Sequence, residues 1–210
     1  MIKSISIENF KGIGDEVKLD LKPITLLFGA NSAGKSTIVH ALHYMREVLE
    51  RGNLNPDKTI VGGQHVDLGG FLGLVHGKSE GKRRTVRLRI VFDAEDVDLP
   101  TWGADYSSLG RVIGVDFESL IDHFKTVAVE VAVAFNPWED FPYVSEARVY
   151  FDGQLFCELK SSSSGRGAAI TQLEEHHSCL LQSSPDITTD IVPTCSVSYT
   201  HLTLPTNREV

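Results

Sequence analysis

The sequence predicts an α/β fold in which one strand, loop and helix form a core and an antiparallel β-sheet lies beside them. The first observation is a glycine-rich loop at 29–36, which stands between a short apolar run and a stretch of helical period. The second is a pair of segments, 86–92 and 127–135, in which large apolar residues occupy every second position, as in strands with one buried face. The third is the region 146–159, where Asp152-Gly153 divides two alternating runs and is typical of a two-residue hairpin turn.

The N-terminal elements follow from the same periods. Residues 3–10 and 17–21 alternate and are expected to form two strands, and the continuous apolar run 24–28 predicts a strand buried on both faces. A helix is expected from Lys35 to Arg51, because Gly52 stands where a C-terminal cap belongs. The residues expected on its buried face are Ile38, Ala41, Leu42, Met45 and Leu49.

Between these elements the patterns are weak. Residues 53–84 are rich in glycine and charge and have no clear period. Residues 93–125 are mixed, with a short helix as one interpretation of 116–124. Another short helix is expected within 171–182.

The sequence divides into three parts. Residues 1–160 are expected to form one lobe of a domain, and 161–196 a linker or poorly defined segment that begins with the serine- and glycine-rich stretch 161–167. Residues 197–210 resemble a translated sequencing adapter, so we expect a non-native tail; a genuine disordered tail is the alternative.

The composition is that of an ordinary globular protein. The chain has 210 residues, of which 41% are hydrophobic and 23% charged, so a packed core is expected. Its formal net charge of -8 repels polyphosphate on average, and DNA would have to be bound through a local basic patch.

Several observations indicate the compartment. The cysteines Cys157, Cys179 and Cys195 are odd in number and widely spaced, so they do not predict a disulfide framework. The sequence has no apolar run of membrane-spanning length and no signal peptide. We therefore expect a cytoplasmic protein without a membrane partner.

The glycine-rich loop, Gly29-Ala30-Asn31-Ser32-Ala33-Gly34-Lys35-Ser36, matches the phosphate-binding pattern G-x-x-x-x-G-K-[ST]. Its glycines let the backbone turn sharply and present N–H groups to phosphate oxygens, and the following helix directs the positive end of its dipole at the same anion. The Lys35 ammonium is expected to reach the outer phosphates and the Ser36 hydroxyl to ligate Mg²⁺. Thr37 adds a hydroxyl for the inner phosphates or for the helix start. The loop predicts a P-loop NTPase core that binds ATP and Mg²⁺; because no guanine-reading Asn-Lys-x-Asp motif occurs, adenine should be favoured.

The beginning of the sequence resembles a known family. The motif I-x-I-x-N-F-K-G at Ile5–Gly12, the loop F-G-A-N-S-A-G-K-S-T, and the stretches Val66–Phe71 and Leu74–His76 are similar to ABC-type AAA ATPase heads. The similar branch contains RecF-type, SbcC-type, structural-maintenance-of-chromosomes and overcoming-lysogenization-defect proteins. The resemblance covers residues 1–93 well and 126–160 loosely, and it implies the N-terminal lobe of such a head.

The resemblance also implies roles for particular residues and partners. In the family the Asn-Phe-Lys turn lies beside the nucleotide, which places Asn9 and Lys11 there, although Lys11 could be only a solvated turn lysine. A glutamine that senses Mg²⁺ and the γ-phosphate would be Gln64, or Gln64 is a surface amide. The full-length family members hydrolyse ATP when a second head closes the site, in DNA repair or phage defence among other roles.

Some family motifs are missing. We find no apolar strand that ends in Asp-Glu, no serine-glycine signature and no switch histidine in a matching motif. Asp93 and Asp116 end apolar runs, but Ala94 and Phe117 follow them where a glutamate is wanted. Two alternatives therefore stay open: a self-contained P-loop NTPase or kinase that uses Asp93 or Asp116 for Mg²⁺, or a non-catalytic nucleotide-binding module. The chain as given is expected to bind ATP without appreciable turnover, as a truncated lobe.

Overall fold

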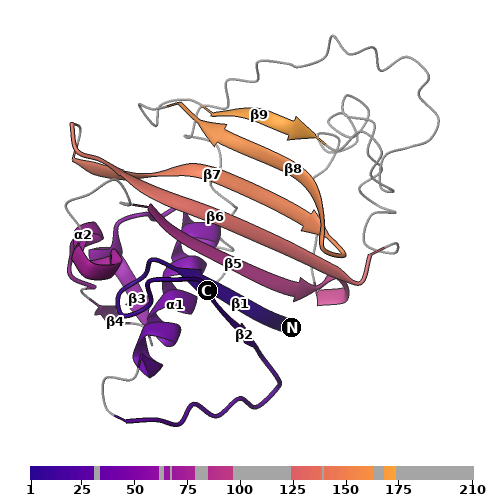
Figure 1. Ribbon diagram of the computed structural model, residues 1–210, viewed down its shortest axis with the longest axis horizontal. Coiled ribbons are helices and arrows are strands. Elements are labelled where there is room, and N and C mark those ends of the chain that lie inside the picture. The colour runs from indigo at the N-terminus through magenta and orange to yellow at the C-terminus, as the bar shows by residue number, and fades with distance from the viewer. Residues whose placement is uncertain are drawn as a thin grey trace, which may run out of the picture.

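A seven-stranded antiparallel sheet organises the molecule (Figure 1). The structure, a computed structural model, describes residues 1–30, 34–61, 64–66, 68–78, 85–96, 124–138, 140–162 and 168–173. The strand order is β2-β1-β5-β6-β7-β8-β9, and every neighbouring pair is antiparallel. The strands are β1 (Ile2–Glu8), β2 (Val17–Asp20), β5 (Thr85–Asp93), β6 (Thr126–Asn136), β7 (Phe141–Phe151), β8 (Gln154–Ser161) and β9 (Ala168–Leu173).

The remaining elements gather on one face of the sheet near its N-terminal strands (Figure 1). They are the helices α1 (Lys35–Arg51) and α2 (Gly70–Leu74) and a small hairpin of β3 (Thr59–Val61) and β4 (Gln64–Val66). Single 3₁₀ turns occur at Pro56–Lys58, His76–Lys78 and Ala94–Asp96.

The main core lies between α1, α2 and the inner face of β1, β5 and β6. Ile5, Leu88 and Val133 supply apolar side chains from the strands, and Tyr44 and Met45 meet them from α1. Each is at most 1% exposed, and burying an aliphatic side chain of this size contributes about 1.5–3 kcal/mol. This packing fixes α1 against the sheet.

The strand predictions based on alternation are confirmed. The segments expected at 3–10, 17–21, 86–92 and 127–135 correspond to β1, β2, β5 and β6. The hairpin is confirmed as well: Asp152 and Gly153 join β7 to β8, with φ of +47° and +81°. Both values lie in the left-handed region that a tight hairpin turn requires.

The helix prediction is confirmed in its bounds. Lys35–Arg51 is helical, and the N–H of Gly52, at φ +60°, donates to the Glu47 carbonyl as a C-terminal cap. The buried face differs from the expected one. Ala41 and Met45 are buried as expected, with Tyr44 and Val48 in addition, whereas three expected residues are only partly buried: Ile38, Leu42 and Leu49. The polar residues Thr37 and Glu47 are buried on this helix as well, and a search for hydrophobic period does not count them.

The apolar run 24–28 was expected to be a buried strand, and this prediction is wrong. The described chain forms no strand there and pairs with no other described strand. Ile24, Leu26 and Phe28 are 81%, 69% and 87% exposed. A continuous apolar run becomes a buried strand only if other strands flank it and layers cover it, and the described residues supply neither.

Other predictions fail where the local pattern is weak. The region 53–84 contains β3, β4 and α2, which its composition did not predict. The helix expected from residue 171 is wrong for 171–173, which end strand β9. The remainder of that helix, and the one expected at 116–124 up to residue 123, lie outside the described residues.

Candidate nucleotide-binding site

The glycine-rich loop ends at a left-handed glycine at the start of α1. Gly34 has φ +85° and ψ 4° and forms the N-cap of the helix. Because glycine has no side chain, Gly34 makes no capping hydrogen bond, and the first turn contains no acidic residue. The N–H groups of this turn therefore keep the capacity to bind an anion, which the positive end of the helix dipole also favours.

The Lys35 side chain folds back over the loop. Its Nζ donates hydrogen bonds of 2.6 Å to the carbonyl oxygens of both Gly29 and Ala30. These two bonds draw the beginning of the loop towards the first turn of the helix, with the ammonium between them. Loop residues Asn31, Ser32 and Ala33 lie outside the described part of the chain.

The two hydroxyl residues after Lys35 face different surroundings. Ser36 is exposed in the first turn of α1. Thr37 is only 8% exposed, and its Oγ1 lies 3.8 Å from where a Cβ on Gly12 would be. Ser36 is therefore accessible to a ligand, whereas Thr37 packs against the turn after β1.

That turn, Asn9–Gly14, is called the Asn-Phe-Lys turn below. Phe10 and Ile13 exchange backbone hydrogen bonds of 2.8 and 2.9 Å, which close it tightly. The Phe10 ring is fully buried, with its centroid 6.2 Å from that of Tyr44 in α1. An apolar anchor thus holds the turn against the helix that carries the loop.

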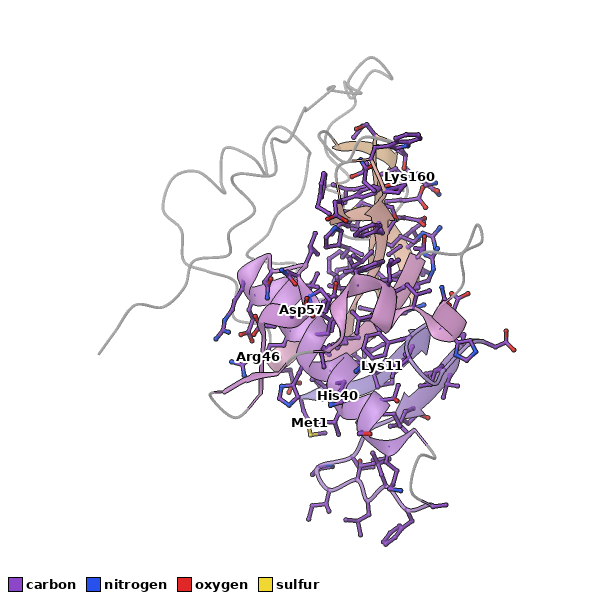
Figure 2. All side chains as sticks on the ribbon, turned by 90° about the vertical axis from the view of Figure 1, so that its left-hand side faces the viewer. Met1, Lys11, His40, Arg46, Asp57 and Lys160 are labelled. Atoms are coloured by element: carbon purple, nitrogen blue, oxygen red, sulfur yellow. The ribbon has the colours of Figure 1, made fainter. Side chains whose placement is uncertain are left out.

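The two residues that the resemblance places at the nucleotide have different environments. The Asn9 amide donates a 2.7 Å hydrogen bond from Nδ2 to the Thr85 carbonyl, which ties the end of β1 to the start of β5. Lys11 lies close to His40 in the second turn of α1 (Figure 2). Burial and the charge of Lys11 lower the pKa of His40, as does the neighbouring His43. The structure thus brings Lys11 to the helix that begins at the loop.

Two of the residues considered for Mg²⁺ stand on different strands, β4 and β5. Gln64 begins β4 and pairs through its backbone with Val61. Asp93 ends β5, where its carboxylate lies 2.9 Å from the Lys3 ammonium and 3.9 Å from the amino terminus. Asp116 lies outside the described residues.

Two kinds of feature are absent from the described part of the chain. The described residues contain no group of three or more His, Cys, Asp and Glu side chains placed to hold a metal ion. None of their helices is long and apolar enough to cross a membrane.

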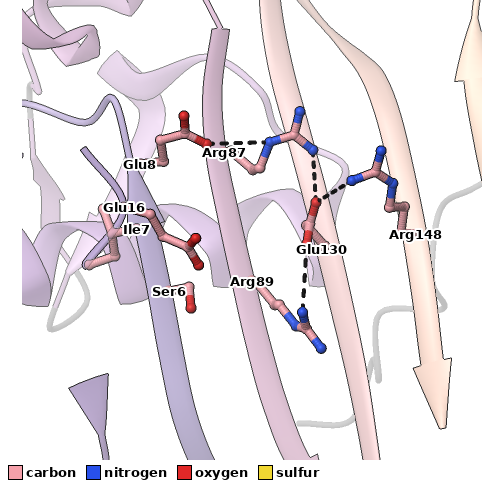
Figure 3. A pocket seen from close by; sticks show the side chains of 8 residues that line it. All are labelled: Ser6, Ile7, Glu8, Glu16, Arg87, Arg89, Glu130 and Arg148. Carbon is pink, nitrogen blue, oxygen red and sulfur yellow. Dashed lines mark hydrogen bonds and ion pairs between the residues drawn. The ribbon is translucent and has the colours of Figure 1, made fainter. Parts of the chain in front are cut away.

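A cavity of about 240 Å³ opens on the sheet face opposite α1 (Figure 3). Three arginines converge there on Glu130: Arg87 and Arg148 lie 2.7 and 3.0 Å from its Oε1, and Arg89 lies 4.0 Å from its Oε2. Glu8 and Glu16 also line the cavity, so positive and negative charges balance. Except for Glu16, the residues that line the cavity stand on β1, β5, β6 and β7, and none belongs to the described part of the phosphate loop.

Sequence reasoning missed two histidines near the candidate site. His40 follows Ser36 by four residues, so a helix places both on one face, and this spacing was a usable signal. His76 contacts the Asn-Phe-Lys turn from 65 residues away in the sequence, through a 2.8 Å contact of its Nδ1 with the Lys11 carbonyl oxygen. No local pattern could reveal a contact of that range.

Comparison with known proteins identifies the family. No curated protein matches the chain. The sequence model of the AAA ATPase domain matches residues 1–171, a span that begins with β1 and extends into β9. With its glycine-rich loop at the start of α1, the chain belongs to the AAA ATPase domain family, which is a family of nucleotide-binding ATPases.

Proposed function

We propose that this chain binds ATP with Mg²⁺ through residues 29–36 and is the nucleotide-binding lobe of an ABC-type ATPase head. One observation carries the proposal. The Lys35 ammonium is hydrogen-bonded to the carbonyl oxygens of Gly29 and Ala30, at the N-terminus of α1, where the first-turn N–H groups are available to an anion. A triphosphate needs this combination of a cation with several N–H donors.

The described residues fit the cofactor. The exposed Ser36 hydroxyl stands in the first turn of α1 and would be a Mg²⁺ ligand, with phosphate oxygens and water completing the coordination. Lys35 would bind the outer phosphates, and the backbone of 30–34 would hold the inner ones, whereas the buried Thr37 would support the helix start. Lys11 and Asn9 would lie beside the nucleotide, and Gln64 would contact Mg²⁺ in a closed site.

Hydrolysis would need groups beyond those found in the sequence. Phosphoryl transfer requires a residue that orients the attacking water, and the family resemblance assigns this role to a glutamate after an apolar strand. Losing a catalytic base typically costs a factor of about 10²–10⁴ in rate. We therefore propose that turnover depends on a complete head that pairs with a second head; DNA as a further partner rests on the resemblance alone.

The alternative of a self-contained NTPase that uses Asp93 for Mg²⁺ has less support. The Asp93 carboxylate is already neutralised by Lys3 and the amino terminus, at the end of β5. A Mg²⁺ role would require both cations to be displaced from it.

Calorimetric titration with ATP and Mg²⁺ tests the proposal. Lys35→Ala should weaken binding about tenfold or more, because a hydrogen-bonded charge on a phosphate is lost. Lys22→Ala, at an exposed lysine outside the loop, is the matched control and should bind as the wild type does. GTP should bind no more tightly than ATP. Equal ATP affinity in the wild type and Lys35→Ala would refute ATP binding through Lys35. Lys35-dependent phosphate release at about one per second would refute the proposal that turnover requires a complete head paired with a second one.

A further inference from the structure

Lys11 occupies a backbone conformation that suits glycine better than lysine. Its φ is +49°, in the left-handed region, and Asn9 two residues earlier has φ +56°. Asparagine tolerates this region because its short amide can hydrogen-bond locally, whereas a lysine side chain offers no such compensation. Backbone strain of this kind persists only where surrounding contacts enforce it, and it is concentrated at functional sites.

The enforcing contacts come from the last residue of α2 and the two residues that follow it. The Lys11 N–H donates to the Leu74 carbonyl, and the His76 N–H donates to the Asn9 carbonyl at 3.2 Å. The His76 ring adds a third contact, with Nδ1 2.8 Å from the Lys11 carbonyl oxygen. Because a carbonyl only accepts, Nδ1 must carry the proton and donate. Both sides of the Lys11 peptide unit are therefore held from residues 74–76.

Gly14 allows the imidazole to approach the turn. A Cβ at residue 14 would lie 3.0 Å from Cδ2 and 3.1 Å from Nε2 of His76. Contacts that short would push the ring away from the turn. Gly14 and His76 thus act together: because Gly14 has no side chain, the His76 ring can come close enough for its Nδ1 to donate to the Lys11 carbonyl.

The contacts of residues 74–76 hold the Asn-Phe-Lys turn close to α1. Gly12 is close to Thr37 in the first turn, and the Lys11 charge reaches His40 in the second turn. Any displacement of the turn would move the Lys11 side chain relative to the helix start and the Lys35 ammonium.

We propose that His76 is a positioning residue of the nucleotide site: by donating from Nδ1 to the Lys11 carbonyl, it holds a left-handed Lys11 so that its ammonium faces the bound phosphates. The inference rests on the proposed function, because it needs a nucleotide at the loop. It assigns His76 no contact with the nucleotide, so the whole effect of His76 must pass through Lys11.

A double-mutant cycle in the full chain tests this, with calorimetric titration of ATPγS and Mg²⁺ as the readout. His76→Leu fills a similar volume without a donor and should weaken binding about fivefold, the effect of one lost hydrogen bond of ordinary strength. His76→Asn, whose Nδ2 can take the place of the ring Nδ1, should restore most of the affinity. In a Lys11→Ala background, His76→Leu should have no further effect.

Gly14→Ala provides a second measurement, because it retains the His76 side chain but displaces its ring from the turn. It should weaken ATPγS binding in the wild type and have little effect in His76→Ala, where no ring is displaced. Circular-dichroism melting of every variant separates loss of affinity from loss of fold.

Each outcome has one meaning. Wild-type affinity in His76→Leu, or an equal loss with and without Lys11, would overturn the positioning role while leaving the Lys35 assignment intact. Wild-type affinity in Lys11→Ala together with weakened binding in His76→Leu would overturn it as well. If Lys35→Ala binds ATPγS as the wild type does, the proposed function and the inference fall together.

Discussion

A residue's own side chain can be the reason that an unusual backbone conformation persists. Four non-glycine residues of the described chain have positive φ: Asn9, Lys11, Asp140 and Asp152. Asp152 shows the reason most clearly. Its Oδ1 accepts hydrogen bonds from the N–H of Lys125 at 3.0 Å, and from the N–H and hydroxyl of Thr126 at 2.8 and 3.2 Å. One carboxylate oxygen therefore ties the β7–β8 turn to the start of β6.

The contacts of Asp152 predict a graded effect of substitution. Asp152→Ala removes all three hydrogen bonds and keeps the strained φ, so it should lower the free energy of unfolding by about 1–3 kcal/mol. Asp152→Asn retains an oxygen acceptor and tolerates the left-handed region, so it should lose less. Urea denaturation of the three proteins measures this; equal stability of Asp152→Ala and the wild type would show that the turn does not depend on the carboxylate.

At the scale of elements, α1 begins and ends at left-handed glycines. Gly34 precedes it at φ +85° and Gly52 follows it at φ +60°. Both values are unfavourable for residues with a Cβ, so the glycines define where the helix stops and where the phosphate loop begins. Between them Tyr44 anchors the helix twice, through its buried ring and through a 2.9 Å hydrogen bond from its hydroxyl to the Leu54 carbonyl.

The left-handed C-cap makes Gly52 sensitive to alanine. Gly52→Ala should destabilise the protein by about 1–2 kcal/mol, because a Cβ is forced into the left-handed region. Gly73→Ala is the matched control: Gly73 lies inside α2, where a Cβ would meet only an ordinary contact of 3.5 Å with the Leu68 carbonyl oxygen. Thermal melting of both variants checks the difference, and a stability loss in Gly73→Ala as large as that in Gly52→Ala would refute the role of φ.

Elements with a strong local period could be predicted from the sequence, and those defined by their neighbours could not. The alternation in β5 and β6 and the cap at Gly52 are local signals, so these elements were predicted. The run 24–28 has a strand composition, but its environment depends on strands elsewhere. At the site, the phosphate-binding pattern at 29–36 could be recognised because its residues are close in sequence. The contact of His76 with Lys11 could not be predicted, because only the fold brings these residues together.

At the scale of the whole molecule, a row of charges crosses the sheet on the face opposite α1. We call it the charge ladder: Arg89 pairs with Glu130, Glu130 with Arg148, and Arg148 with Glu158, in register across β5, β6, β7 and β8. Alternating signs on facing residues stabilise neighbouring strands and oppose a shift in register. Ser6 on β1 faces Arg89 and extends the row to a fifth strand.

The end of the charge ladder should make stability depend on pH. Hydrogen bonds from Lys160 and then Arg148 hold the pKa of Glu158 well below its ordinary value of 4.5. A carboxyl with a lowered folded-state pKa contributes stability that is fully present above pH 4.5 and is lost as the pH falls towards the folded-state pKa.

Glu158→Gln should therefore lower the free energy of unfolding at pH 7 by about 1–2 kcal/mol, and the difference from the wild type should shrink as the pH falls below 4.5. Guanidinium titrations at pH 7, 5 and 3 measure the two curves. Asp15→Asn, at an exposed position, is the control and should follow the wild type at every pH. A difference between Glu158→Gln and the wild type that does not change with pH would contradict the ionic origin of the effect.

The exposed run 24–28 has a thermodynamic consequence for the loop that it precedes. Ile24, Leu26 and Phe28 lead directly into Gly29, yet their side chains have almost no packing to hold that approach in one conformation. If only a fraction of molecules has the competent loop, the apparent dissociation constant for ATP is the intrinsic one divided by that fraction. If a binding partner covered the three side chains and so raised that fraction, ATP would strengthen the binding of that partner by the same factor. In that case, a measurement of nucleotide affinity would indicate whether the exposed run 24–28 is covered.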